Sequence, residues 1–155
     1  GKTKLEADNY LISSNKLYAI IRPNTLYHGS NINFFTWVYN NISNDNKITV
    51  VNDQISNPSY IPSLVNSIID IIVMNGLGLY HHGSKDSFSR YQFALMIAAK
   101  YNFNPELIIE SNTIQLNQNA KRPLQSILNT DKIENDFDSQ MLYVNSCIDN
   151  IYEIT

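Results

Sequence analysis

Apolar and polar positions follow two different rhythms along this chain. Compact apolar runs typical of buried strands fall at Leu17–Pro23 and Lys47–Asp53, with shorter ones at Leu77–Gly83 and Glu106–Ser111. Apolar residues recur at helical spacing in the segments between and after them. These helical segments are Asn31–Ile42, Ile61–Met74, Ser89–Phe103 and Gln140–Tyr152. Strands that alternate with helices predict an α/β fold.

Two of the helical segments carry clear signals for where they start. Pro62 suits the first turn of the segment Ile61–Met74. Ser89 faces Gln92 three residues later, which is the spacing of a capping box. Six apolar residues of the Ile61–Met74 segment form one stripe, which predicts the face that packs. They are Ile61, Leu64, Val65, Ile68, Ile69 and Ile72.

Composition excludes several classes of protein. The chain has 155 residues, 43% of them hydrophobic and 16% charged, which is ordinary for a globular domain. A net charge of −3 with scattered basic residues argues against a nucleic-acid partner. The apolar run Ile68–Met74 is interrupted by Asp70 and too short to span a membrane. With Cys147 as the single cysteine, no internal disulfide can form, and we expect a reducing, cytoplasmic setting.

The strands are few and short for a complete doubly wound domain. Neither a GxGxxG motif nor a phosphate-binding loop is present in the sequence. Gly76 and Gly78 precede a strand and are interpreted as a helix stop. The chain therefore resembles the second half of a protein whose nucleotide-binding half would precede Gly1.

The opening stretch, Gly1–Leu11, is predicted to be part of a helix that has already begun. A tyrosine directly before Gly1 would make a Tyr-x-x-x-Lys pair with Lys4, on one helix face. A lysine ammonium beside a phenol lowers the tyrosine pKa, so the tyrosine could give a proton to a carbonyl while a nicotinamide gives hydride. An exposed, solvated lysine is the alternative interpretation of Lys4.

Five stretches resemble the extended short-chain dehydrogenases/reductases, in the family's order. "GKTKLEADNYL" resembles their active-site helix, and "IIRPNTLYHGSNINFF" the strand and loop Arg-Thr-Ser-Trp-Val-Tyr…Asn-Phe of dTDP-4-dehydrorhamnose reductases. "VVNDQISNPSYIPSLV" is similar to their Asn-Asp-Gln-x-Gly-x-Pro-Thr segment, and "GLYHHGSKDSFSRYQFA" to Gly-x-Tyr-His with Ser-x-Tyr-Glu-Phe-Ala. "RPLQSILNT" resembles their Arg-Pro-x-x-Ser-x-Leu-x-Thr ending. The resemblance runs from Gly1 to about Phe137.

The resemblance implies an N-terminal Rossmann domain for the cofactor and a smaller C-terminal lobe for a sugar nucleotide. Residues 1–28 would end the Rossmann domain, and residues 29–155 would mainly form the lobe, leaving open that short segments return to the Rossmann sheet. The intact protein would reduce a 4-keto-deoxysugar nucleotide with NADPH or NADH, in nucleotide-sugar biosynthesis. This chain alone is predicted to be inactive, because the Tyr and the Gly-rich cofactor loop would lie before Gly1. A homodimer is left open.

Two other functions stay open. One is a non-catalytic member that binds a partner enzyme, as the regulatory beta subunit of methionine adenosyltransferase does, since "RPNTLYHG" resembles its Arg-x-Pro-x-Leu-Tyr-Gly. The other is a sugar-nucleotide epimerase of the same superfamily.

The resemblance also implies which residues carry the function. Lys4 would be the catalytic lysine, and it would bind the cofactor together with a loop at the end of a strand. The expected cofactor-binding residues are Lys4, Arg22, Pro23 and Asn24. The expected substrate-binding residues are Thr25, Tyr27, Asn33, Phe34, Gln54, Pro58 and Arg122. No metal site is predicted, because His81 and His82 are adjacent on a strand and point to opposite faces.

Several of these residues have a second interpretation. Tyr27 could instead be a packed core ring. Arg122 could bind the substrate diphosphate or pair with Asp53 to tie the lobe together, and we favour the pair. Thr25 stands where the rhamnose-pathway reductases carry Trp, and Ser56 or Asn57 replaces the family's Gly, where Asn would tolerate left-handed backbone. Trp37 and Cys147 are expected in the core.

Overall fold

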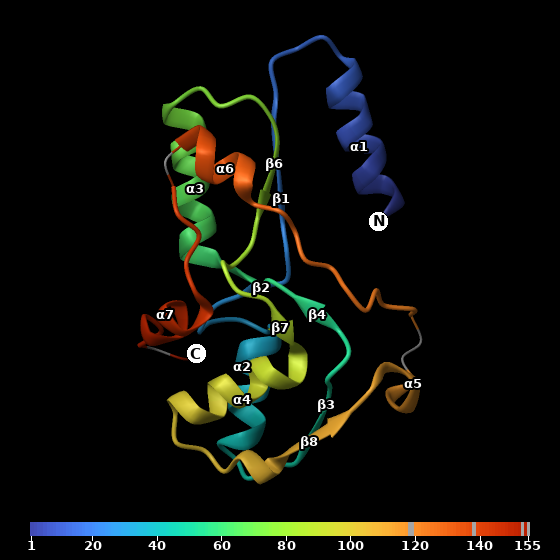
Figure 1. The fold of residues 1–155 in the computed structure, drawn as a ribbon, viewed down its shortest axis with the longest axis vertical. Helices are drawn as coiled ribbons and strands as arrows, with labels where there is room; N and C mark the ends of the chain where they lie inside the picture. The colour runs from blue at the N-terminus through green and yellow to red at the C-terminus, as the bar shows by residue number, and fades with distance from the viewer. Residues whose placement is uncertain (118–119, 138, 153, 155) are drawn as a thin grey trace.

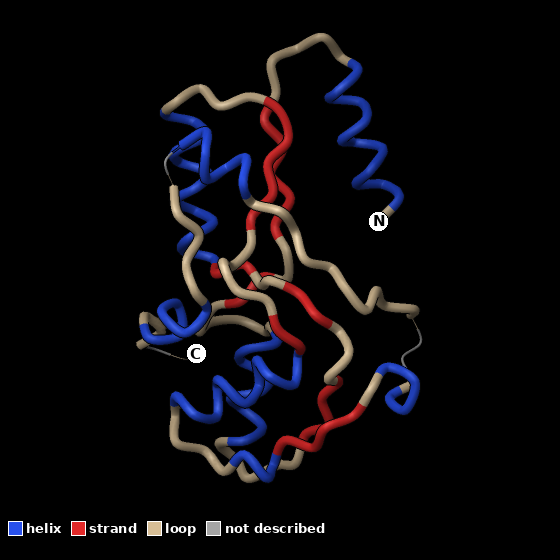
Figure 2. The backbone as a smooth tube through the Cα atoms, viewed as in Figure 1, coloured by secondary structure: helices blue, strands red, loops and turns tan. Residues whose placement is uncertain are grey.

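The structure, a computed structural model, describes residues 1–117, 120–137, 139–152 and 154. It confirms the α/β class: short strand pairs carry helices on their sides (Figures 1 and 2). Within the described ranges the strands form four two-stranded pairs, three of them parallel and one antiparallel. No helix described by the structure is long and apolar enough to cross a membrane.

The upper half of the molecule in Figure 1 is built on one parallel pair. β1 (Ala19–Pro23) runs beside β6 (Gly78–His82), with Ala19 opposite Gly78 and Pro23 opposite His82. The helices α3 (Ile61–Val73) and α6 (Asp131–Phe137) lie on one side of the pair, and α1 (Lys2–Ser13) stands on the other. A small core holds this half together. Its buried members are Ile71, Tyr80, Ile133, Phe137 and Met141.

The lower half is built on a second parallel pair. β3 (Ile48–Val51) runs beside β8 (Ile108–Ser111), and α2 (Phe34–Ile42) and α4 (Arg90–Lys100) pack together against it. The larger hydrophobic core lies here, around buried rings and aliphatic chains from each of these elements. The 3₁₀ turn η1 (Pro105–Leu107) leads into β8, and α7 (Val144–Asp149) packs on α4.

Very short strands join the two halves. β2 (Leu26–Tyr27) pairs in parallel with β5 (Ser59–Tyr60), and β4 (Ile55–Ser56) pairs antiparallel with β7 (Phe88–Ser89). The hydrophobic pattern did not predict these two-residue strands or the four-residue helix α5 (Thr113–Leu116), because elements of that length have no period to detect.

Two of the main helices, α2 and α4, begin where a side chain satisfies free backbone N–H groups. The Asn33 side chain caps α2 and accepts hydrogen bonds from the N–H groups of Phe35 and Thr36. The predicted capping box of Ser89 and Gln92 is confirmed, and Pro62 lies in the first turn of α3 as predicted. These local signals are strong because the first turn of any helix lacks intrahelical partners for its N–H groups.

The predicted helix is confirmed as α3, but its apolar stripe lies mostly outside the packed core of the described chain. Of its six residues only Leu64 is buried, and the residues of α3 that pack inward are Leu64, Ser67 and Ile71. Ile72 is 68% exposed and Ile69 is 51% exposed. α1 has no buried residue either. The chain therefore presents large apolar side chains on both helices that flank β1 and β6.

A buried amide at Asn57 joins the segments that meet at the end of β1. Its Nδ2 donates to the carbonyl oxygens of Leu128 at 2.9 Å and Ser84 at 3.3 Å. Its Oδ1 accepts from Asn24 Nδ2 and from the Leu128 N–H, both at 2.9 Å. Asn57 does not have a positive φ, so the fold does not use the tolerance of asparagine for left-handed backbone here. Its side chain, rather than its backbone conformation, explains an asparagine here.

The Asn57 amide is a stability determinant that mutation can test. Asn57→Ala removes one acceptor and one donor from a buried site and leaves their partners unsatisfied. We expect the free energy of unfolding to fall by about 2–4 kcal/mol, measured by urea denaturation. The control is Asn46→Ala, which changes an exposed asparagine. A loss for Asn57→Ala no larger than that of the control would contradict the role of the network.

His82 gives the fold a pH dependence. Its ring is 1% exposed, and burial lowers its pKa to about 4. In the unfolded chain the ring has a pKa near 6.5. Between about pH 6.5 and 4 the unfolded state therefore binds a proton that the folded state does not bind. Stability therefore falls as the pH drops through this window, by about 3 kcal/mol for this residue.

Two variants separate this effect from general acid unfolding. His82→Gln keeps a polar atom toward Ser63 and removes the titrating ring. We expect its unfolding free energy to lose less between pH 6.5 and 4.5 than that of the wild type, in urea denaturation at each pH. His81→Gln, on the adjacent and partly exposed residue, should keep the wild-type slope. Equal slopes in all three proteins would rule out His82 as the source.

Candidate functional site

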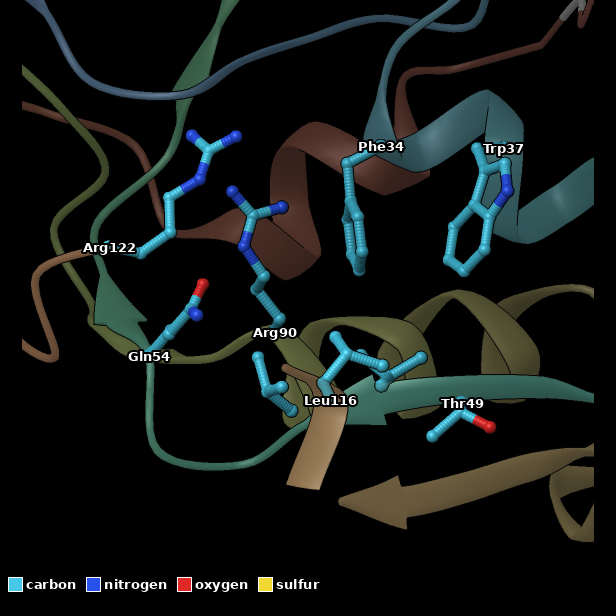
Figure 3. Close-up of a pocket in the computed structure, with 9 residues that line it drawn as sticks. Phe34, Trp37, Thr49, Gln54, Arg90, Leu116 and Arg122 are labelled. Atoms are coloured by element: carbon cyan, nitrogen blue, oxygen red, sulfur yellow. The ribbon is translucent and has the colours of Figure 1, made fainter. Parts of the chain in front are cut away.

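A pocket of about 350 Å³ opens between α2, β3 and the start of α4 (Figure 3). Its two ends differ in chemistry. Arg122 and Gln54 lie at one end, Phe34 and Trp37 lie at the other, and Arg90 lies between them. Aliphatic side chains and Thr49 complete the wall. The lining residues are Phe34, Trp37, Thr49, Val50, Val51, Gln54, Arg90, Leu116 and Arg122.

A smaller chamber of about 100 Å³ adjoins the pocket at the arginine end. It shares Gln54, Arg90 and Arg122 with the larger pocket. Its remaining wall is mostly polar or small. These residues are Thr25, Ile55, Ser56, Pro123 and Ser126. The two spaces together form an elongated site with an aromatic end, a cationic middle and a polar far end.

Arg90 is fixed in place at the first residue of α4. Its backbone N–H donates to the Gln54 carbonyl oxygen at 3.2 Å, and its guanidinium carbon lies 5.1 Å from the centre of the Phe34 ring. Burial, and then the charge of Arg122, lower the pKa of Arg90. In the part of the chain that the structure describes, neither arginine forms an ion pair with a carboxylate. The middle of the site is therefore a region of uncompensated positive charge.

The predicted pair between Arg122 and Asp53 is wrong. The Asp53 carboxylate accepts hydrogen bonds from the Thr113 N–H at 3.0 Å and from its Oγ1 at 2.8 Å. These bonds hold the pKa of Asp53 below its usual range. Thr113 Oγ1 also meets Gln54 Nε2 at 3.1 Å. Asp53 thus anchors the start of α5 beside the pocket, which leaves Arg122 to face the site.

The predicted substrate-binding residues divide into two groups. Phe34, Gln54 and Arg122 line the main pocket, and Thr25 lines the adjoining chamber. Tyr27, Asn33 and Pro58 do not line either space, and their contacts are structural. Tyr27 is fully buried among the rings of Phe35, Tyr60 and Phe93, which is the core role rather than a substrate contact. The Asn33 amide is occupied by the cap of α2.

Pro58 is a buried residue of the linking segment. Its carbonyl oxygen accepts a hydrogen bond from the Ser84 N–H at 2.9 Å. It lines a tight crevice with Thr25, Phe34 and Phe93 beneath the main pocket. Pro58 therefore packs next to residues that line the pocket and its chamber.

Three of the four predicted cofactor-binding residues, Lys4, Arg22 and Pro23, line a separate space beside β1. An open hollow of about 640 Å³ lies between α1 and β1 and is lined by Lys4, Asp8, Arg22 and Pro23, among others. Arg22 Nε and Nη2 both donate to Asp8 Oδ2, at 2.9 and 2.6 Å, which ties β1 to α1. The Lys4 ammonium has no hydrogen bond or ion pair within the described ranges.

Asn24 separates the hollow from the pocket. Its N–H donates to the His82 carbonyl oxygen and to Ser59 Oγ, both at 3.0 Å, and its Nδ2 donates to Ser126 O at 2.6 Å. Its Oδ1 accepts from the Thr25 N–H at 2.8 Å. Asn24 therefore has a structural role in this fold, and its predicted cofactor contact stays a prediction. Pro23 lines the hollow and Thr25 lines the chamber, so a single residue, Asn24, lies between the two spaces along the chain.

Two of the lining residues that sequence reasoning missed give the pocket much of its chemistry. Trp37 was expected in the core, but its side chain is 40% exposed and lines the aromatic end. Arg90 lies within the stretch SRYQFA, to which the resemblance gives no role in binding. A signal was present, because a cation at the first position of a helix is unfavourable beside the positive end of the helix dipole, so an arginine there needs another explanation.

No metal site is found in the described part of the chain. No group of three or more His, Cys, Asp or Glu side chains is placed there to hold a metal ion. The Cys147 side chain is buried on α7, as predicted for a core thiol.

Comparison with known proteins gives the fold and family. The structure superposes on that of dTDP-4-dehydrorhamnose reductase from Bacillus anthracis, solved in complex with NADP, with a TM-score of 0.90 at 24% identity, covering 97% of this chain and 53% of that one. A dTDP-4-dehydrorhamnose reductase from Clostridium acetobutylicum gives a TM-score of 0.84 at 26% identity, covering 96% and 54%. These likenesses show the reductase fold.

The curated relatives agree. The chain is 29% identical over 151 residues to the dTDP-4-dehydrorhamnose reductase of Aggregatibacter actinomycetemcomitans, which covers 90% of this chain and 51% of the relative. The chain thus spans about half the length of the curated relatives it matches. The family model described as "RmlD substrate binding domain" matches residues 1–153. On this match over nearly its whole length, the chain belongs to the RmlD substrate binding domain family.

Proposed function

We propose that this chain is the substrate-binding part of an NAD(P)H-dependent reductase that acts on the 4-keto group of a deoxysugar nucleotide, as in dTDP-4-dehydrorhamnose reduction. One observation carries the proposal. The hollow with Lys4 reaches Pro23 and the chamber with Arg122 reaches Thr25, so the two spaces approach each other at the end of β1. A cofactor in the first and a sugar nucleotide in the second would meet at the end of β1, which is where ligands bind in open α/β sheets.

The residues of the hollow fit a nicotinamide cofactor. When bound, the nicotinamide supplies the hydride that reduces the carbonyl. The Lys4 ammonium donates hydrogen bonds to the ribose hydroxyls and holds down the pKa of a tyrosine one helical turn before it. That tyrosine position precedes Gly1, and the family resemblance implies it. The ion pair between Arg22 and Asp8 holds α1 against β1 and so orients Lys4.

The residues of the pocket fit a nucleotide sugar. Phe34 and Trp37 offer ring faces for a base, and the guanidinium of Arg122 matches the geometry of a phosphate. The adjoining chamber, with Thr25 and Ser126, leads toward the hollow and suits the hydroxyl groups of a sugar. This order places the base farthest from Lys4 and the sugar nearest to it.

The exposed apolar faces support the view that the intact protein is longer. A parallel strand pair is normally covered on both faces and extended by further strands. Here β1 pairs only with β6 among the described residues, and α1 and α3 carry exposed side chains such as Leu5 and Ile72. An N-terminal Rossmann half, of the length by which the relatives exceed this chain, would cover these faces and supply most of the cofactor site.

A reductase is better supported than the other two functions considered. The curated relative and the two solved structures described above are named as dTDP-4-dehydrorhamnose reductases. The non-catalytic regulatory subunit and the epimerase have no comparable support in this site.

Substitution of Lys4 tests the catalytic role. In the intact protein, Lys4→Met should lower kcat/KM for a 4-keto sugar nucleotide by about 100-fold or more, followed by NADPH oxidation at 340 nm. The alkaline limb of the pH profile should also move to higher pH, because the tyrosine acid loses the ammonium that lowers its pKa. Lys2→Met changes an exposed lysine two residues away on the same helix and should retain activity. Equal activity of both variants would exclude Lys4 as the catalytic lysine.

The isolated chain of 155 residues should not oxidise NADPH in the presence of a 4-keto sugar nucleotide. It lacks a Gly-rich cofactor loop and the proposed proton donor, so hydride transfer has neither its donor site nor its acid. The same spectrophotometric assay, run beside the intact protein, checks this expectation. Turnover by the isolated chain would show that it carries a complete active site.

A further inference from the structure

The charge on Arg90 has no carboxylate partner among the described residues. Arg90 is half-buried, starts α4, and forms no ion pair with a carboxylate in the described part of the chain. A buried arginine is normally paired, because an unpaired charge in a poorly solvated site raises the energy of the folded state. The helix dipole makes this position still less favourable for a cation. A ligand of negative charge would remove both penalties.

The geometry holds the Arg90 guanidinium ready for such a ligand. It packs on the Phe34 ring at 5.1 Å, and the backbone of Arg90 is bonded to Gln54, so both ends of the residue are restrained. Figure 3 shows the guanidinium groups of Arg90 and Arg122 next to each other, with Arg90 on the side of Phe34. Arg122 is exposed and comes from a different segment of the chain, so the two groups approach the site separately.

Two separate guanidinium groups fit two linked phosphates better than one. A single phosphate can be bound by the Arg122 fork alone, since one guanidinium satisfies two phosphate oxygens. A second phosphate on the side of the base would fall in the middle of the pocket, where Arg90 lies between Arg122 and Phe34. The like charges of Arg90 and Arg122 repel each other when the pocket has no anion, and a ligand with two anionic groups relieves that repulsion most.

We propose that Arg90 is a specificity-determining residue of this pocket, and that it selects ligands with two linked phosphates over ligands with one. The inference rests on the proposed function only in taking a nucleotide-linked ligand as the occupant. It assigns a role to a residue that the family resemblance left without one. The aromatic end contributes to binding both kinds of ligand and does not by itself distinguish them.

The test compares a nucleoside diphosphate with the matching monophosphate. Affinities for dTDP and dTMP are measured by titration calorimetry on the intact protein, saturated with NADPH so that the cofactor site is not open to the nucleotide. The wild type should bind dTDP about tenfold or more tightly than dTMP. Arg90→Met, which keeps a long apolar stem over Phe34, should reduce this preference to about threefold or less, chiefly by weakening dTDP.

Matched variants make the result specific. Lys100→Met removes one charge from the other end of α4 and should keep the wild-type preference. Arg122→Met should weaken the binding of both nucleotides, because the Arg122 guanidinium binds a phosphate in each of them. Arg90→Lys keeps the charge without the planar fork and should keep a preference between those of the wild type and Arg90→Met. This last variant also covers the case in which Arg90→Met fails to fold.

Three results would overturn the inference: a wild type without preference for dTDP, an Arg90→Met variant that keeps the preference, or, where Arg90→Met does not fold, an Arg90→Lys variant that keeps the full wild-type preference. Failure of the proposed function is a different result. If the wild type prefers dTDP and Arg90→Met does not, yet no 4-keto sugar nucleotide is reduced, the reductase proposal fails and the role of Arg90 stands. If reduction occurs and Arg90→Met leaves the preference intact, only the inference about Arg90 fails.

Discussion

The arrangement of the site depends on the buried amide of Asn57. Its hydrogen bonds to Asn24 and to both backbone groups of Leu128 join the end of β1 to the long segment that carries Arg122. Gly83 packs so closely that a Cβ on it would lie 2.6 Å from Asn57 Nδ2, so this crossing has no spare room. Because the amide and its partners are buried, breaking one hydrogen bond leaves polar groups that water cannot reach and that have no other partner. The hydrogen bonds of the network therefore depend on one another. It fixes how far the Lys4 hollow lies from the arginine pocket.

The carboxylates near the two spaces have partners other than the arginines of the pocket. Asp8 is paired with Arg22 and orients α1, and Asp53 is bonded to Thr113 and anchors α5. Neither carboxylate neutralises Arg90 or Arg122. The pocket therefore keeps a positive potential that does not stabilise the fold. An anionic ligand would complement it.

Local signals in the sequence predicted local structure well, while contacts between distant segments were beyond it. Ser89 with Gln92 and Pro62 marked helix starts correctly, since a capping bond spans three residues. The partner of Asp53 was misjudged, because Thr113 is sixty residues away in the chain. The stripe on α3 was found but its partner was not, because periodicity shows that a helix has an apolar face but not what covers it. The resemblance found Phe34, Gln54 and Arg122 in the pocket, and missed Arg90 and Trp37 because only the folded chain brings them there.

A crystal structure of the intact protein with NADP⁺ and a dTDP-linked sugar would test the central claim most directly. The account predicts the nicotinamide in the hollow with Lys4 on its ribose, the diphosphate between Arg90 and Arg122, and the sugar in the chamber beside Thr25. The reacting carbon of the sugar should lie within about 3.5 Å of the nicotinamide C4 atom. A sugar nucleotide bound away from the arginine pocket, or a cofactor that does not contact Lys4, would contradict the account.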